Sequence, residues 1–294
     1  MNAKLIINAD DFGIHPEINK GILDSFKNGA LTSTTLLVTT PYLAESVDAL
    51  KVLNQSLPTG LHISLTLGTA IAPVSDVTAL VNEDGRFKLS AKHLMFVRPG
   101  NSSGALFEQI EIEIGAQIRK ALELGVAIDH IDSHQHVHMN PCLYGIFERQ
   151  AKLHGIDTIR FCREKFISAL AFRNIGKNLV RQNPVKWALI KRFQKRIKPQ
   201  LTSTDFFFGL MHSGNIDENV MLGVLRFIPA GKSMEIGIHP GVPLGAENSA
   251  YPEKNVDLFI QSKERDVERR VLISPRVLDE INKLGITLVS FGDL

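Results

Sequence analysis

Short apolar runs alternate along the chain with longer segments in which apolar residues recur every three or four positions. Continuous or alternating short runs are typical of strands, whereas a period near 3.6 residues is typical of helices. The short runs predict strands at 4–8, 34–39, 60–65, 128–132, 158–161, 233–238 and 286–290. The longer segments predict helices at 17–27, 43–53, 106–124, 141–154, 217–227, 262–272 and 275–283. Alternation of this kind predicts parallel strands joined by helical crossovers, an α/β fold.

Helix-end signals agree with these boundaries. Gly125 follows the helix predicted at 106–124 and is a candidate for its C-terminal glycine cap. Pro141 stands at the first position of its helix, where a missing backbone N–H is tolerated. Ser274 is expected to cap the helix at 275–283 through its hydroxyl. Residues 68–104 are expected to form one long loop.

The 294 residues show no break in composition, so we expect one domain spanning 1–294. A single α/β barrel commonly uses about 250 residues, and a core of that size folds without disulfides. The two cysteines, Cys142 and Cys162, form no CxxC pair and are expected to be reduced thiols. The first apolar run, 5–9, is too short for a signal sequence, and no run is long enough to span a membrane. The expected location is cytoplasmic.

Several polar residues share one structural position, the C-terminal end of a predicted strand. In a barrel or open parallel sheet these ends open onto one face, and active sites form there. Residues far apart in sequence would therefore converge. The residues with this position are Asp10, Asp11, His62, Asp132, His134, Arg160 and His239.

The adjacent aspartates after the first strand have two interpretations. Asp10 and Asp11 could be a helix cap and a solvated turn residue. Alternatively, one carboxylate binds a metal while its neighbour takes a proton, because adjacent side chains diverge.

Four of the ten histidines fall within nine residues, at His130, His134, His136 and His138. Imidazole is the commonest metal ligand, and two imidazoles with a carboxylate suit a divalent ion that keeps open positions. Alternate residues of an extended segment point the same way, so some of these histidines could bind substrate or orient other groups instead.

Of the remaining histidines, His62 could be a core residue or a ligand, and His239, before a Pro-Gly turn, suits a general acid. Surface or loop positions are expected for the others: His15, His93, His154 and His212.

Taken together, these segments resemble the YdjC-like carbohydrate deacetylases. The matching stretches are LIINADDFG (5–13), NGALTSTTLLV (28–38), GLHISLTLG (60–68), HIDSHQHVHMNP (130–141), IRFCRE (159–164) and IGIHPG (236–241). The resemblance implies a distorted TIM-like barrel of about seven parallel strands, related to the polysaccharide deacetylases. It also implies removal of acetyl groups from N-acetylated sugars with one divalent metal ion, Mg²⁺ or Zn²⁺.

Residue roles follow from the same resemblance. It implies that Asp11, His62 and His134 are the metal ligands. Asp10 would be the catalytic base, and His239 the acid that protonates the leaving amine. For substrate binding it points to Arg160, which could instead partner Asp10, and to His136 and His138.

A basic segment departs from the shorter family members. Ten lysines and arginines and no acid lie between Lys165 and Gln200, so the rest of the chain is net acidic. We expect a basic helical insertion around 166–201, with an apolar face formed by Trp187, Ile190, Phe193 or Gln194, and Ile197. Three interpretations remain open: a solvated basic face over the core, a lid, or an interfacial helix at 185–198 that touches anionic lipid.

The expected partner is an N-acetylated sugar or a glycolipid. Nucleic-acid binding is not expected, because the basic segment is short and the rest of the chain is acidic. Base rates favour a homodimer. Two other functional classes stay open: a metal-dependent phosphoesterase, and a non-catalytic carbohydrate-binding protein on the same fold.

Overall fold

The computed structural model describes residues 2–53, 56–100, 104–165, 183–244 and 260–294. Seven parallel strands form its sheet: β1 (Lys4–Phe12), β2 (Ser33–Leu36), β3 (Thr59–Ile63), β4 (Ile128–Ser133), β5 (Phe206–Phe208), β6 (Ser233–Ile238) and β7 (Thr287–Leu288). The α-helices of the described part are α1 (Pro16–Asn28), α2 (Leu43–Val52), α3 (Ala91–Phe96), α4 (Gly104–Glu123), α5 (Pro141–Leu153), α8 (Asn183–Gln194), α9 (Glu218–Leu225), α11 (Glu264–Leu272) and α12 (Pro275–Lys283). Short 3₁₀ turns are η1 (Val74–Asp76), η2 (His134–Met139) and η3 (Phe291–Asp293).

The strand order is β4-β3-β2-β1-β6-β5, with β7 added beside β1. Every pairing between these seven strands is parallel, as the alternation of strands and helices predicts. Apolar side chains of β1 are fully buried, because helices cover the sheet. The expected α/β fold with about seven parallel strands is confirmed.

Backbone hydrogen bonds also join the two end strands through residues 158–163. Arg160 N donates to the carbonyl of Ile131 in β4 (3.0 Å), and Ile159 N donates to the carbonyl of Thr202 (2.9 Å). Phe207 N of β5 donates to the carbonyl of Arg163 (3.0 Å). The strand expected at 158–161 is thus present only as isolated parallel bridges, and this irregular seam distorts the barrel.

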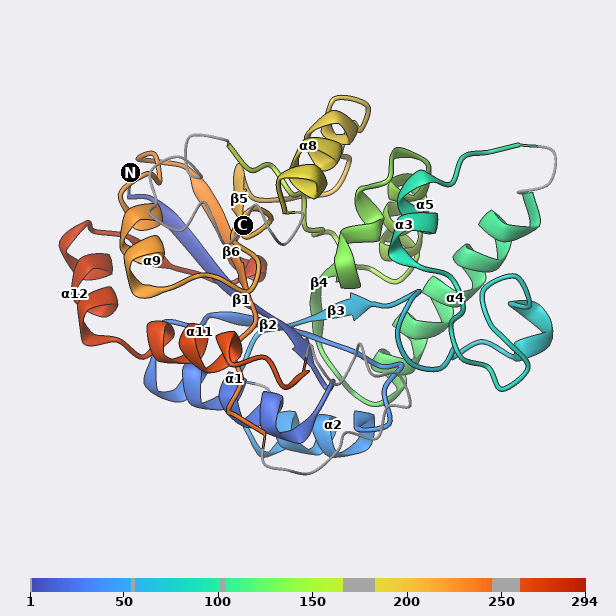
Figure 1. Cartoon of the computed structure of the whole chain (residues 1–294), viewed down its shortest axis with the longest axis horizontal. Helices are drawn as coiled ribbons and strands as arrows, with labels where there is room; N and C mark the ends of the chain where they lie inside the picture. Colours follow the sequence, from blue (N-terminus) through green and yellow to red (C-terminus); the bar gives the residue numbers. More distant parts are fainter. Residues whose placement is uncertain (1, 54–55, 101–103, 166–182, 245–259) are drawn as a thin grey trace.

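Strand β7 is a second source of distortion. It pairs with Lys4 and Leu5 at the beginning of β1, whereas β2 pairs with β1 only from Asn8 onward. Both use the same edge of β1, since Thr287 N and Thr32 N donate to carbonyls on that edge. The chain therefore ends beside its beginning (Figure 1).

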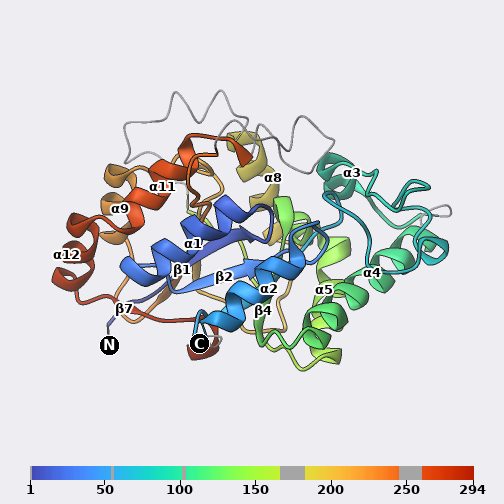
Figure 2. The same cartoon turned by 90° about the horizontal axis from the view of Figure 1, so that it is seen from below.

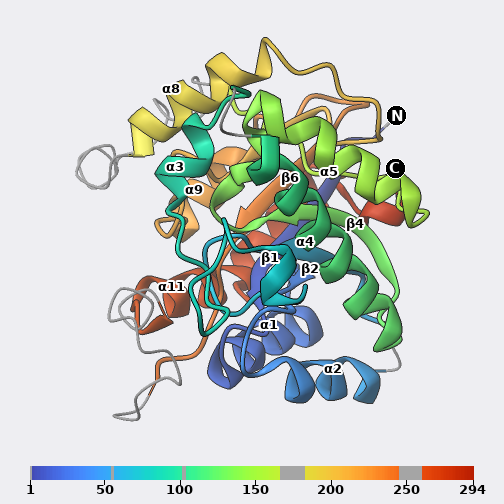
Figure 3. The same cartoon turned by 90° about the vertical axis from the view of Figure 1, so that its right-hand side faces the viewer.

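Helices surround the sheet on several sides. Figure 1 shows α9, α11 and α12 on one side of the strands and α4 and α5 on the other. Seen from below, α1 and α2 lie across β1 and β2 (Figure 2). Figure 3 shows α4 and α5 facing the viewer, with α8 running along the top. No helix in the described ranges is long and apolar enough to cross a membrane.

Several local expectations are confirmed and others are wrong. Gly125 has a φ of +79° at the end of α4, the conformation that favours glycine. The loop expected at 68–104 contains α3, whose six residues are too few to show a clear helical period. Ser274 precedes α12, but its hydroxyl donates to Glu218 (2.6 Å) and does not cap the helix. Strand β5 was not expected, because its run of three apolar residues is shorter than a strand signal.

Part of the expected basic insertion is helix α8, while 166–182 lie outside the described residues. Ile190 and Phe193 are buried, and α8 packs against η2. Lys191, Arg192, Lys195 and Arg196 are exposed. The described part of the insertion thus uses its apolar side for packing and presents its basic side to solvent. The single domain spanning 1–294 stays a prediction.

Glu164 is a buried carboxyl that holds the turn after β5. It is 3% exposed and accepts hydrogen bonds from Leu210 N (2.7 Å) and more weakly from Met211 N (3.4 Å). Burial raises the pKa of Glu164 to about 7, although these N–H donors oppose the shift.

We predict that Glu164→Gln makes stability less sensitive to pH. A carboxyl with a raised folded-state pKa contributes stability that is complete below its unfolded pKa of 4.5 and is lost as the pH rises through about 7. Between these values the free energy of unfolding of the wild type should fall relative to the variant by up to about 3 kcal/mol. Urea titrations across this pH range measure the difference. Glu123→Gln, at an exposed carboxyl, is the control, and equal pH slopes for both variants would contradict the prediction.

Candidate functional site

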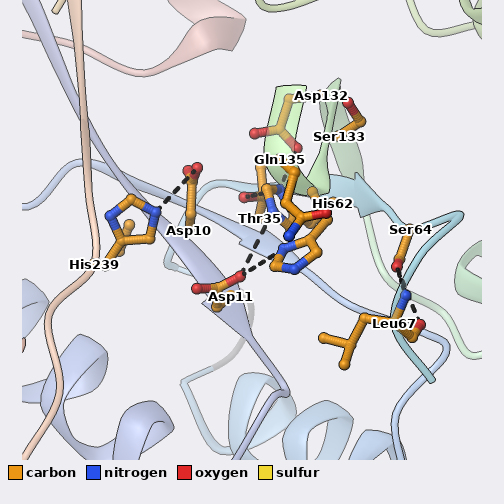
Figure 4. Close-up of polar contacts among 12 residues, drawn as sticks. Asp10, Asp11, Thr35, His62, Ser64, Leu67, Asp132, Ser133, Gln135 and His239 are labelled. Atoms are coloured by element: carbon orange, nitrogen blue, oxygen red, sulfur yellow. Dashed lines mark hydrogen bonds and ion pairs between the residues drawn. The ribbon is translucent and has the colours of Figure 1, made fainter. Parts of the chain in front are cut away.

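The end of β1 is irregular where the two aspartates lie. The register with β2 shifts between Ala9 and Phe12, so that Asp10 and Asp11 lie opposite one residue of β2. Asp11 has a φ of +71°, a conformation that costs a non-glycine residue about 1–3 kcal/mol. Because the bulge breaks the alternation of side chains, both buried carboxylates reach the same site from adjacent positions. In Figure 4, Asp10 turns toward His239 and Asp11 toward His62.

Asp11, His62 and His134 form a compact group of potential metal ligands. Asp11 Oδ1 lies 3.6 Å from His62 Nε2 and 3.2 Å from His134 Nδ1. One ligand atom from each residue lies within 4.8 Å of the other two, and all three residues are buried. Asp11 Oδ1 itself has no hydrogen-bond partner in the described structure. A buried oxygen left unpaired between two imidazoles fits a divalent cation, so the expected ligand set is brought together.

His62 is oriented by groups behind it. Its Nδ1 lies 2.6 Å from Asp132 Oδ1 and 3.2 Å from Thr35 Oγ1. In the neutral ring, the form that binds a metal, donation from Nδ1 to Asp132 leaves the lone pair on Nε2, the nitrogen that faces Asp11. Burial lowers the pKa of His62, but Asp132 and the two neighbouring aspartates outweigh burial and raise it to about 9.

The other clustered histidines point elsewhere, because the chain turns sharply after His134. Gln135 and His136 have φ values of 59° and 60°, two consecutive left-handed residues. His136 Nδ1 lies 3.6 Å from Cys162 Sγ, and His138 Nδ1 lies 2.6 Å from Ser133 Oγ.

His130 occupies a separate position. It contacts Asp129 (2.6 Å) and stacks on Phe291, with ring centroids 3.6 Å apart. Of the four clustered histidines, only His134 therefore faces Asp11.

Arg160 lies at the centre of a buried ionic cluster. Its guanidinium bridges both oxygens of Asp10, at 2.8 and 2.7 Å, so the expected pairing with Asp10 is present. It also contacts Asp132 Oδ2 (2.5 Å) and Glu235 Oε1 (2.6 Å). Burial raises the pKa of Asp10, but the guanidinium outweighs burial and holds it below its ordinary value. Burial dominates at Glu235 and raises its pKa to about 7.

The substrate-binding interpretation of Arg160 and His138 stays a prediction. Both side chains are 0% exposed, so neither has a surface that a sugar could contact in this conformation. His136 is 6% exposed. All three residues are therefore buried among other protein groups.

A second acidic group, Asp10, His62 and Asp132, also brings three potential ligand atoms together. Here the guanidinium of Arg160 already bonds both aspartates. A metal cation would find no unpaired oxygen on Asp10, because both of its oxygens accept hydrogen bonds from Arg160. The geometry therefore favours the group around Asp11 as the metal site.

His239 follows β6 and faces Asp10. Its Nε2 lies 3.9 Å from Asp10 Oδ2, and its side chain is 16% exposed. Burial lowers the pKa of His239 to about 4, although the neighbouring aspartates oppose the shift. The imidazole is therefore neutral near pH 7 and can receive a proton.

Three residues of the site were missed from the sequence: Glu235, Arg265 and Glu268. Glu235 is a charged residue in an otherwise apolar strand pattern, which was a usable signal. Arg265 and Glu268 lie in the highly charged helix α11, where nothing in the pattern separates them from surface residues. His212 lies in a turn, which agrees with the expected surface or loop position, but it is buried and stacks on Phe208.

The chain is similar over nearly all of its length to several known proteins. The family model described as YdjC-like protein matches residues 4–283. A protein from Thermoanaerobacter pseudethanolicus named carbohydrate deacetylase is 30% identical, covering 99% of this chain and 98% of its own. One of the same name from Geobacillus stearothermophilus is 29% identical, covering 98% and 96%. A crystal structure from Enterococcus faecalis, described as a cellobiose-phosphate cleavage protein, has a TM-score of 0.74 at 28% identity, covering 100% and 99%.

We predict that Arg160→Met destabilises the fold strongly. It leaves the carboxylates of Asp10, Asp132 and Glu235 buried without their shared cation. Breaking a buried ion pair in this way costs about 3–5 kcal/mol. Urea unfolding measures the loss against Arg163→Met, an exposed arginine from the same segment. A loss no greater than that of the control would show that the cluster is not needed for stability.

Proposed function

The chain belongs to the YdjC-like protein family, and from that premise we propose that it is a metal-dependent hydrolase that removes the acetyl group from an N-acetylated sugar. One observation carries the proposal: the ligand group Asp11, His62 and His134 lies directly beside Asp10 and His239. A metal site with an adjacent carboxylate and imidazole matches the needs of amide hydrolysis. The names of the two bacterial relatives support an acetylated carbohydrate as substrate.

The three-ligand set suits one divalent ion, Mg²⁺ or Zn²⁺. Such an ion would supply Lewis-acid polarisation of the acetamide carbonyl and make a water molecule more acidic. Asp11 contributes its unpaired Oδ1, and His62 presents Nε2 because Asp132 holds its Nδ1.

Asp10 is the base in this proposal. Its low pKa keeps it ionised, the state that accepts a proton from the attacking water. Two hydrogen bonds from Arg160 fix the carboxylate in orientation. A fixed carboxylate loses little entropy as the transition state forms.

His239 is the proton donor to the leaving amine. Because it is neutral in the resting site, it must first gain a proton, and Asp10 Oδ2 lies 3.9 Å from its Nε2. The proton taken from water by Asp10 passes to His239 and then to the amide nitrogen as the C–N bond breaks. Water and the N-acetyl sugar thus yield acetic acid and a free amine, with Asp10 and His239 restored. The acid then loses its proton and the amine gains one, which gives acetate and an ammonium group.

A phosphoesterase is less well supported. Two-metal phosphoesterases use additional carboxylates that bridge the ions. The additional aspartates here, Asp10 and Asp132, are bonded to Arg160 instead. A non-catalytic binding protein would have no need for a base and a proton donor beside the ligand group.

Acetate release tests the function directly. The purified chain is incubated with chitooligosaccharides, with and without a chelator, and acetate is measured by an enzyme-coupled assay. We expect release that the chelator abolishes and that added Mg²⁺ or Zn²⁺ restores. The proposal would be refuted if the protein released no acetate from any N-acetylated sugar in the presence of any of the added metal ions.

We predict that Asp10→Asn keeps the metal and loses turnover. The asparagine cannot accept the proton, and loss of a general base typically lowers the rate about 10²–10⁴-fold. Metal content by atomic absorption should stay unchanged, because Asp10 is outside the proposed ligand set. Asp84→Asn, at an exposed loop position, is the matched control. Near-normal kcat in Asp10→Asn would contradict the base assignment.

Contact of α8 with an anionic membrane stays a prediction for a glycolipid substrate. With Ile190 and Phe193 buried, attraction would rest on the exposed basic side chains. Flotation with anionic vesicles should then show binding that salt abolishes. Lys191→Gln with Lys195→Gln should weaken it, and a protein that never floats would exclude the contact.

A further inference from the structure

Helix α11 lies outside the barrel but contacts both halves of the proposed site. Arg265 and Glu268 are three residues apart, so they project from the same face of the helix. They are 3% and 1% exposed. Charged side chains are almost never buried so fully unless they are paired, so their partners indicate why they are there.

Arg265 contacts the proposed metal ligand Asp11. Its Nη2 donates to Asp11 Oδ2 at 2.8 Å. The other oxygen, Oδ1, faces His62 and His134 and has no hydrogen-bond partner in the described structure. The two oxygens of Asp11 therefore have different surroundings. Oδ2 is held by Arg265, and Oδ1 faces the proposed metal position.

Glu268 contacts the backbone of His239, the proposed proton donor. Its Oε2 accepts from the backbone N–H of His239 (2.7 Å), and its Oε1 accepts from Ile216 N (3.2 Å). Oε2 also lies 3.9 Å from His239 Nδ1. One carboxylate thus fixes the end of β6 and faces the ring nitrogen remote from Asp10.

A third contact ties the turn after His239 to the same helix. Gly241 N donates to the carbonyl of Arg265 (3.2 Å). On its other side, Gly241 lies against Gly21 of α1, where a Cβ would come within 2.4 Å of the Gly241 Cα. The turn is therefore clamped between α1 and α11, and it has little freedom to move.

We propose that α11 positions both halves of the site, with Arg265 fixing Asp11 as a ligand through one oxygen and Glu268 fixing His239 as the proton donor. The inference rests on the proposed function. Arg265 and Glu268 are positioning residues, because each acts through another side chain or backbone group.

The metal half of the inference has a test that does not depend on turnover. Chelator-treated protein is titrated with Zn²⁺ and with Mg²⁺ by isothermal calorimetry. In Arg265→Gln we expect affinity to fall about 10–100-fold, the usual effect of losing a group that orients a ligand. A purely electrostatic role predicts the opposite sign, because removing a cation beside the site would strengthen metal binding.

Two variants serve as controls for this titration. Arg269→Gln removes an arginine from the same helix that pairs with Asp24 and Asp266, away from the ligand group. It should keep wild-type affinity. Arg265→Lys keeps the charge and one hydrogen bond, so it should recover most of the affinity even if Arg265→Gln folds poorly. Unchanged or tighter binding in Arg265→Gln, or no recovery in Arg265→Lys, would overturn this half.

The catalytic half is tested by separating kcat from KM. In Glu268→Gln we expect kcat for acetate release to fall about 10–100-fold while KM and metal affinity stay near wild type. Glu268→Asp keeps the charge and should recover part of kcat. Glu264→Gln, on the same helix and bonded to Ser262, is the matched control. Equal kcat in Glu268→Gln and the control, or a loss confined to KM, would overturn this half.

The two levels of failure are distinguishable. Failure of the proposed function would appear in the wild type, as absent metal binding or absent acetate release, and would remove the inference with it. Failure of the inference alone would appear as a wild type that does both while the α11 variants behave like their controls.

Discussion

The pairing of Arg160 with buried carboxylates is the interaction on which the site depends. One guanidinium contacts Asp10, Asp132 and Glu235, which come from β1, β4 and β6. Arg160 itself lies in the irregular segment that joins β4 to β5. Carboxylates buried so closely would repel one another strongly without a shared cation. The cluster therefore links four parts of the barrel at the level where the functional side chains begin.

The residues of this cluster in turn orient the neighbouring side chains of the site. Asp132 holds Nδ1 of His62, so that Nε2 faces Asp11, and Arg160 holds Asp10 toward His239. The bulge at the end of β1 lets two adjacent carboxylates take separate partners. A regular strand would direct them to opposite faces. The positive φ of Asp11 therefore accompanies the separation of the proposed ligand, Asp11, from the proposed base, Asp10.

Contacts from outside the barrel complete the arrangement. Helix α11 adds a cation to Asp11 and a carboxylate to the backbone of His239. The basic helix α8 packs on the segment that carries His136, and its Lys191 and Arg192 are exposed. The match to the YdjC-like family spans residues 4–283, a range that includes the central site as well as α8 and α11.

The sequence by itself determined the parallel α/β fold and the strand-end positions of Asp10, Asp11, His62, His134 and His239. Local apolar periodicity and the geometry of parallel strands suffice for that much, because both act over a few residues. Tertiary structure alone decided that Arg160 and His138 are fully buried, that strand 158–161 survives only as bridges, and that Arg265 and Glu268 belong to the site. A charged residue on a helix has the same local pattern whether it faces solvent or a buried partner. Only packing of segments distant in sequence distinguishes the two, because burial and pairing are properties of the assembled chain.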